Sequence, residues 1–192
     1  DGTGALGVAR VTGAAAGSRP GSATHSVRES VATFVENAIA PDEMARRIQD
    51  LQALGLPWLV KQLDGISVGY AYAGPWKQRS AYRRSVESTV YIEAGCMGRG
   101  LGFELYSSLL EALRATQTHA VIGGIALPKA ASIALHEKLG FRKIGQFQEV
   151  GSKLARRVDV GDLEFVIWLR LRYHALCVDG WTSLAPDAHR AP

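Results

Sequence analysis

The sequence predicts a single mixed α/β domain, in which strand-like and helix-like segments follow one another along the chain. A chain of 192 residues with 47% hydrophobic and 21% charged residues is long enough for one well-buried core and short for two domains. Asp64-Gly65 separates two strand-like runs, which is a strong signal for a β-hairpin. A glycine-rich turn, Gly95 to Gly102, joins a β-branched run to a helical one.

The first elements follow from local signals. Residues 1–21 are rich in Gly and Ala, and within them Ala5 to Val11 is a possible but weak first strand. A helix is expected to start at Pro41-Asp42-Glu43, because proline suits the first turn and acids suit the positive end of the helix dipole. It is expected to end near Gly55.

Three strands and the long helix come next. The hairpin strands are Trp58 to Leu63 and Ile66 to Tyr72, and a third strand runs from Val86 to Ile92. After the glycine-rich turn, leucines at helical spacing predict a helix from near Phe103 through Leu113. This order of elements indicates a mixed sheet with helices packed against it.

The C-terminal part continues the alternation. His119 to Ala126 is expected to be a strand, and a short helix after Pro128 is expected to stop at Gly140. Two further strands are expected at Phe141 to Phe147 and Leu163 to Leu171. Residues 173–192 are expected to form a loosely attached tail.

Composition limits the class of function. The formal charge of +4 favours small anionic molecules without requiring nucleic acid. No apolar run reaches the length of a membrane span, so we expect a soluble chain with no membrane partner. Cys96 and Cys177 belong to no paired motif, so we expect a cytoplasmic protein without disulfide or metal site.

The glycine-rich turn is suited to phosphate. Glycines permit close backbone approach, and the first amides of a helix point at an anion placed there. Phe103-Glu104 stands where a P-loop needs Lys-Ser/Thr, and Leu105 stands where a dinucleotide fingerprint needs Gly. Glycines at 98, 100 and 102 instead resemble the cofactor loop of GCN5-related N-acetyltransferases (GNATs). A turn that merely allows tight strand–helix packing explains the loop about as well.

A more specific resemblance covers about residues 30 to 170. Four runs in the same order are similar to phosphinothricin acetyltransferases, a branch of the GNAT superfamily: residues 58–60, 69–77, 86–91 and 135–141. The resemblance implies a GNAT domain at residues 22–172, with a central twisted mixed β-sheet whose middle strands splay apart, flanked by helices. It also implies acetyl-CoA as co-substrate, a homodimer, and direct attack by a small amino acid's α-amine in a ternary complex.

Two residues match the catalytic positions of that family. Glu87 corresponds to the general base, and its place inside a β-branched strand predicts partial desolvation and a raised pKa. His136 matches a histidine that lies near the glutamate and relays the proton or orients the amine. The alternative interpretation of each residue is structural. Glu87 would then be an exposed carboxylate on a strand, and His136 a packed histidine on a helix.

The resemblance also implies the cofactor site. These residues match the positions that hold acetyl-CoA: Val90, Ile92, Gly98, Arg99, Gly100, Leu101, Gly102 and Ser132. Ser132 at the start of a helix would equally suit a capping role. The chain departs from the family at Met97, where Arg or Gln is usual, and at Lys129, where Asn is usual.

A basic and aromatic loop is the expected acceptor site. By resemblance, Lys77, Arg79 and Tyr82 hold the substrate's carboxylate and anionic end, and Phe34 closes over its side chain. The expected function is therefore transfer of acetyl to the α-amine of a small anionic amino acid such as phosphinothricin or methionine sulfoximine. Two alternatives stay open, namely a GNAT enzyme for a different amine and a non-catalytic module that binds nucleic acid through this loop.

Overall fold

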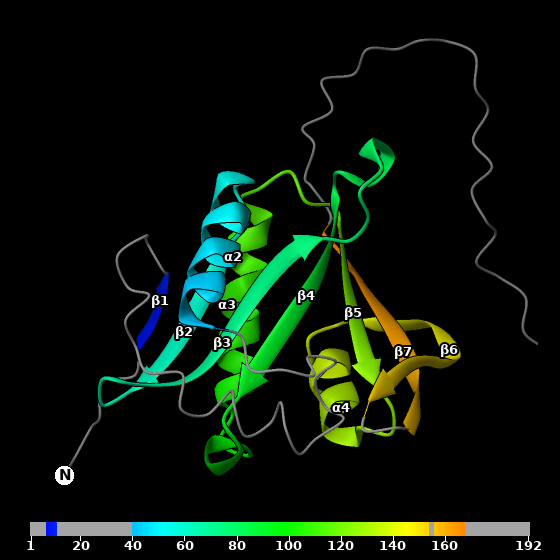
Figure 1. The fold of residues 1–192 in the computed structure, drawn as a ribbon. Coiled ribbons are helices and arrows are strands. Elements are labelled where there is room, and N and C mark those ends of the chain that lie inside the picture. The colour runs from blue at the N-terminus through cyan, green and yellow to red at the C-terminus, as the bar shows by residue number, and fades with distance from the viewer. Residues whose placement is uncertain (1–6, 11–39, 154–155, 168–192) are drawn as a thin grey trace, which may run out of the picture.

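A computed structural model describes residues 7–10, 40–153 and 156–167, which form one seven-stranded mixed sheet with helices on both faces (Figure 1). The strand order is β1-β2-β3-β4-β5-β7-β6. The elements are β1 (Gly7–Arg10), α2 (Pro41–Ala53), β2 (Trp58–Leu63), β3 (Ile66–Pro75), β4 (Ser85–Ile92), α3 (Leu101–Arg114), β5 (Ala120–Ala126), α4 (Ala130–Lys138), β6 (Arg142–Lys153) and β7 (Arg156–Val166).

The elements up to α4 lie where the sequence predicts them. Asp64 and Gly65 have φ of 50° and 77°, the left-handed pair that a two-residue hairpin turn needs. Helix α3 begins two residues earlier than expected, at Leu101, because Gly100 with φ 81° serves as its N-cap. The expected C-terminal glycine stop is also confirmed, since Gly140 follows α4 with φ 91°.

The last two strands differ from the prediction. Strand β6 extends to Lys153, and β7 occupies Arg156–Val166 rather than residues 163–171. Register shifts between Lys143 and Gly145 and between Phe147 and Gly151 break the alternation of polar and apolar residues, which hid the full strand length. Most residues before 40 and all residues after 167, including the expected tail, lie outside the described ranges.

Helices α2 and α3 cover opposite faces of the sheet (Figure 1). On the α3 face, Leu105, Leu109 and Leu113 are fully buried at four-residue spacing and pack with Val86 and Val121. Burial of each such side chain contributes about 1.5–3 kcal/mol. The α2 face holds a second apolar cluster built on Ile48 and Trp58, with Met44, Leu51, Val60, Tyr70 and Tyr72 around it.

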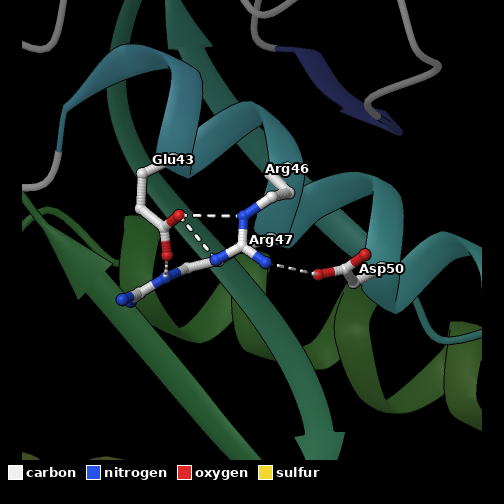
Figure 2. A network of polar contacts seen from close by, with 4 residues as sticks. All are labelled: Glu43, Arg46, Arg47 and Asp50. Carbon is white, nitrogen blue, oxygen red and sulfur yellow. Dashed lines mark hydrogen bonds and ion pairs between the residues drawn. The ribbon is translucent and has the colours of Figure 1, made fainter.

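The outer surface of α2 is charged. Glu43 accepts from Arg46 at 2.6 Å and Arg47 at 2.8 Å, and Arg46 also lies 3.6 Å from Asp50 (Figure 2). These pairs are exposed and screened by water, so they mark the solvent side of the helix rather than hold the fold together. Among the described residues, no helix combines the length and apolarity that crossing a membrane requires.

The feature that positions the site is a fork between the middle strands, where pairing stops after Glu87 and Ile122. Strands β4 and β5 are parallel and pair only through Ser85, Val86 and Glu87 with Ala120, Val121 and Ile122. Both strands continue beyond this point, β4 to Ile92 and β5 to Ala126, and they diverge (Figure 1). The splayed middle strands expected from the sequence are therefore confirmed.

A buried hydroxyl chain holds the fork at its apex. Ser88, 7% exposed, donates its hydroxyl hydrogen to the Ile122 carbonyl at 3.1 Å. The Tyr106 hydroxyl lies 2.6 Å from the Ser88 oxygen and must be the donor, since Ser88 has already used its hydrogen. The Ser88 side chain thus supplies the next hydrogen bond between β4 and β5, and the Tyr106 hydroxyl connects Ser88 to α3.

Replacing Ser88 with alanine should destabilise the fold by about 1–3 kcal/mol, because it leaves the Tyr106 hydroxyl and the Ile122 carbonyl buried without this partner. Urea unfolding of both proteins measures the difference. Ser108→Ala is the matched control, because its hydroxyl bonds only the Glu104 carbonyl at the exposed side of α3. Equal losses in the two variants would contradict a special role for the hydroxyl chain.

Candidate active site

Two adjacent glycines of β5 bring the predicted catalytic residues to the fork. Gly123 and Gly124 are the first residues of β5 beyond its last pairing with β4. A Cβ built on Gly123 would lie 2.6 Å from Nε2 of His136, and one built on Gly124 would lie 3.4 Å from Oε1 of Glu87. Successive residues of a strand face opposite sides of the sheet. Glu87 and His136 therefore reach the fork from opposite faces of the sheet, and their catalytic pairing stays a prediction.

Glu87 combines access to solvent with a raised pKa. It projects from β4 on the α2 face, opposite Gly74 of β3. The Cβ position of Gly74 lies 3.6 Å from Leu51, so α2 covers the strand position opposite Glu87. Partial desolvation raises the pKa of Glu87, and the nearby Asp162 carboxylate raises it further. The raised pKa predicted from the strand environment is thus present.

His136 is buried on the α3 face, where its neutral form is favoured. Its ring meets Tyr106 and Phe141 edge-on, at 5.0 Å between centroids in each case. Nδ1 lies 2.7 Å from the Ser132 carbonyl and must carry the hydrogen, because a carbonyl only accepts. Burial lowers the pKa of His136, as does Lys129, against the opposing effect of the Ser132 carbonyl. The lone pair of Nε2 therefore faces Gly123 at the fork.

Asp162 is a site residue that the sequence reasoning missed. It lies on β7 directly opposite Gly124, and a Cβ built on Gly124 would lie 3.7 Å from its Oδ1. Burial raises the pKa of Asp162, and the positive charge of Lys77 lowers it. The adjacent glycines at 123 and 124 were the available signal, since glycine inside a strand often marks a close approach.

In the basic loop after β3, contacts with two aromatic rings position Lys77. The Lys77 ammonium lies 4.4 Å from the centre of the Trp76 ring and 5.6 Å from that of Tyr82. The two rings meet edge-on at 5.3 Å, which fixes the loop after β3. Arg79 is exposed, and its carbonyl accepts the Tyr82 amide at 2.9 Å. The remaining predicted substrate residue, Phe34, lies outside the described residues.

The glycine-rich turn forms an open backbone surface ahead of α3. Gly98 and Gly100 have φ of 76° and 81°, and nothing lies within 4 Å of a Cβ built on either. Leu101 is buried as the first residue of the helix, whereas Arg99 is exposed, as is Met97 with 58% of its surface. The first amides of α3 have no intrahelical acceptor and face this surface.

Between the turn and the fork, strand β4 carries backbone groups without a β5 partner. Val90 and Ile92 pair with Ala71 and Gly69 of β3 on one side, and their side chains pack against the α3 core. Gly102 lies beside Ile92 and Leu135, with Cβ distances of 3.6 Å and 3.5 Å, so the turn and α4 border the same space. Ser132 is not the helix cap, since Lys129 occupies that position.

Comparison with known proteins identifies the family. An acetyltransferase (GNAT) domain family matches residues 22–160. The chain belongs to the GNAT acetyltransferase family. A phosphinothricin N-acetyltransferase of Streptomyces coelicolor is 40% identical over 139 residues, which cover 71% of this chain and 81% of the relative. An L-methionine sulfoximine/L-methionine sulfone acetyltransferase of Salmonella typhimurium is 34% identical over 164 residues, 85% of this chain and 88% of the relative.

A solved relative supports the fold of this GNAT protein. The GNAT superfamily phosphinothricin acetyltransferase of Sinorhizobium meliloti, crystallised with acetyl-CoA, superposes with a TM-score of 0.78 at 31% identity. The match covers 84% of this chain and 88% of that one. The predicted family, fold and enzyme class are confirmed. Within the described ranges, no cluster of three or more His, Cys, Asp or Glu could hold a metal ion.

Proposed function

We propose that this GNAT enzyme moves the acetyl group of acetyl-CoA to the α-amine of a small amino acid of the phosphinothricin or methionine sulfoximine class. One observation carries the proposal: a carboxylate with a raised pKa, Glu87, stands at the point where β4 and β5 separate. The named relatives support the acceptor class, because they include phosphinothricin and methionine sulfoximine acetyltransferases.

The acceptor must lose a proton before it attacks. An α-amine has a pKa of roughly 8, so it is mostly protonated near neutral pH. A carboxylate whose pKa is raised is a stronger base than an ordinary one, and Glu87 can take this proton on the α2 face. Lys77, with Arg79 and Tyr82 on the same loop, offers positive charge and hydrogen bonds to the acceptor's carboxylate and to an anionic side chain. His136 offers a lone pair at the fork from the other face.

The residues of the fork and the turn fit acetyl-CoA, which supplies the thioester-bound acetyl group. The β5-facing backbone of β4 beyond Glu87 has no β5 partner, so Val90 and Ile92 can pair with an amide-containing arm. Amides from Gly98 to Gly102 suit a pyrophosphate at the helix start. Met97 offers no charge there, which leaves the backbone amides and the exposed Arg99 as the contacts on this loop.

Replacing Glu87 with glutamine should lower kcat/KM by about 10²- to 10⁴-fold, because the amide cannot accept the proton. Thiol release from acetyl-CoA with phosphinothricin and methionine sulfoximine measures the rate, and calorimetry should find acetyl-CoA affinity unchanged. In the wild type, kcat/KM should rise with pH through a pKa above that of ordinary glutamate, because Glu87 works only when deprotonated. This rise at low pH, the acid limb of the pH profile, should be absent from the variant.

Glu137→Gln is the control for that experiment, since Glu137 is an exposed carboxylate on α4. A fully active Glu87 variant, or an acid limb that persists in it, would reject Glu87 as the base.

Replacing Gly100 with alanine should raise the KM for acetyl-CoA by about tenfold, equivalent to about 1.4 kcal/mol. Gly100 has φ 81°, a conformation that costs an L-residue about 1–2 kcal/mol, so the turn must either relax or stay strained. Either result misplaces the amides that face the pyrophosphate. Gly95→Ala is the control, because Gly95 lacks a positive φ and has equally open space. An equal KM in both variants would argue against this phosphate site.

We also propose that the enzyme is a homodimer that uses the outer strand β6. Ile144, Phe147 and Val150 are 53%, 54% and 62% exposed on this edge strand, an arrangement that suits an interface. Light scattering at micromolar concentration should give twice the chain mass, and Phe147→Glu should lower it. Ile66 at the hairpin turn, which is 67% exposed, provides the control, Ile66→Glu. A single-chain mass for the wild type would contradict the proposal.

A further inference from the structure

The space above Gly124 is bounded by two carboxylates. A single point, the Cβ position of Gly124, lies 3.4 Å from Oε1 of Glu87 and 3.7 Å from Oδ1 of Asp162. The third neighbour is a methyl carbon of Val160, also at 3.7 Å. Gly124 itself is exposed and has no side chain to fill this space. An atom of a bound molecule that rests on Gly124 therefore contacts both carboxylates.

Both carboxylates are available to a ligand. Within the described residues, neither Glu87 nor Asp162 has a hydrogen-bond donor or a cation within ion-pairing distance. Lys77 influences Asp162 electrostatically from beyond that distance. Glu164, two residues along β7, shares the face but lies opposite Ile122 rather than Gly124. Two carboxylates without a direct ion-pair partner that face one partly desolvated point favour a cation there.

The position of this point ties it to acetyl transfer. Gly124 lies two residues beyond Ile122, where β5 has just separated from β4. Its α2-facing side is the side from which Glu87 would take a proton. The one cation that every α-amino acid brings to this place is its own ammonium group.

We propose that Asp162 is a specificity-determining residue that binds the acceptor's α-ammonium beside Glu87 and favours amino acids with uncharged side chains. This inference rests on the proposed acetylation of amino acids. Asp162 holds the nitrogen by charge and by hydrogen bonding, and Glu87 then takes one of its protons. Because Asp162 interacts electrostatically with Lys77, it partly offsets the positive charge that would attract an anionic side chain.

The proposal separates two acceptors of similar size. Methionine sulfone carries a neutral polar side chain, whereas phosphinothricin carries an anionic one. With Asp162 present, the second negative charge of phosphinothricin meets repulsion and a weakened Lys77. With asparagine in its place, that repulsion disappears, while the ammonium of either acceptor loses a charged partner.

The test compares Asp162→Asn with Glu164→Gln, a carboxylate on the same strand and the same face. Initial rates with methionine sulfone and phosphinothricin, across a range of pH, are measured for the wild type and both variants. Asp162→Asn should raise the KM for methionine sulfone by about tenfold, the factor that corresponds to about 1.4 kcal/mol. It should also shift the kcat/KM ratio toward phosphinothricin and move the acid limb to lower pH, because Glu87 loses a repelling neighbour. Glu164→Gln should leave the acceptor ratio and the limb unchanged.

The outcomes distinguish this inference from the function on which it rests. If the wild type acetylates both amino acids and Asp162→Asn leaves both the acceptor ratio and the acid limb unchanged, the role of Asp162 is rejected and the function stands. A merely structural role would reduce both acceptors equally and would also lower the urea midpoint, which rejects the inference as well. If the wild type acetylates neither amino acid, the proposed function fails and the inference falls with it.

Discussion

The organisation of this protein depends on one interruption in a hydrogen-bond ladder. Strands β4 and β5 pair through Glu87 and Ile122 and then separate, although both continue. The Ser88 hydroxyl takes over at that point by bonding the Ile122 carbonyl, and Tyr106 of α3 supports it. The strands therefore separate at a fixed residue, with backbone groups free to pair with a ligand. In a sheet whose ladder continued to Ile92, these groups would already be satisfied.

The two faces of the fork have different electrostatic characters. On the α2 face, Glu87 and Asp162 are partly desolvated neighbours, and each has a raised pKa. On the α3 face, His136 is enclosed by aromatic rings, and burial lowers its pKa. The raised pKa makes Glu87 a stronger base, whereas the lowered pKa of His136 favours its neutral imidazole. The acidic face is the side suited to a cationic nitrogen.

The sequence predicted most elements because their signals are local. Pro41 with its acidic neighbours marks the start of α2, Asp64-Gly65 marks a turn, and leucines at helical spacing mark α3. The bounds of the last two strands were predicted wrongly because bulges near Gly145 and Gly151 interrupt the alternation of polar and apolar residues. An irregular strand has no simple period. The site was predicted in part: Glu87 and His136 do lie at the fork, but no spacing along the chain shows that they face opposite sides of β5. Asp162 could not be found as Glu87's neighbour, because three strands must assemble before the two residues meet.

The sequence by itself determined the kind of protein this is. A β-branched strand, three alternating glycines and a leucine-lined helix fix a strand–turn–helix unit whose backbone suits phosphate, because backbone preference and amphipathic period act over a few residues. The tertiary structure decided where charge is desolvated and which side chains share a space. Those properties depend on the strand order β4-β5-β7, which places Gly124 between Glu87 and Asp162 through contacts between residues far apart in the chain.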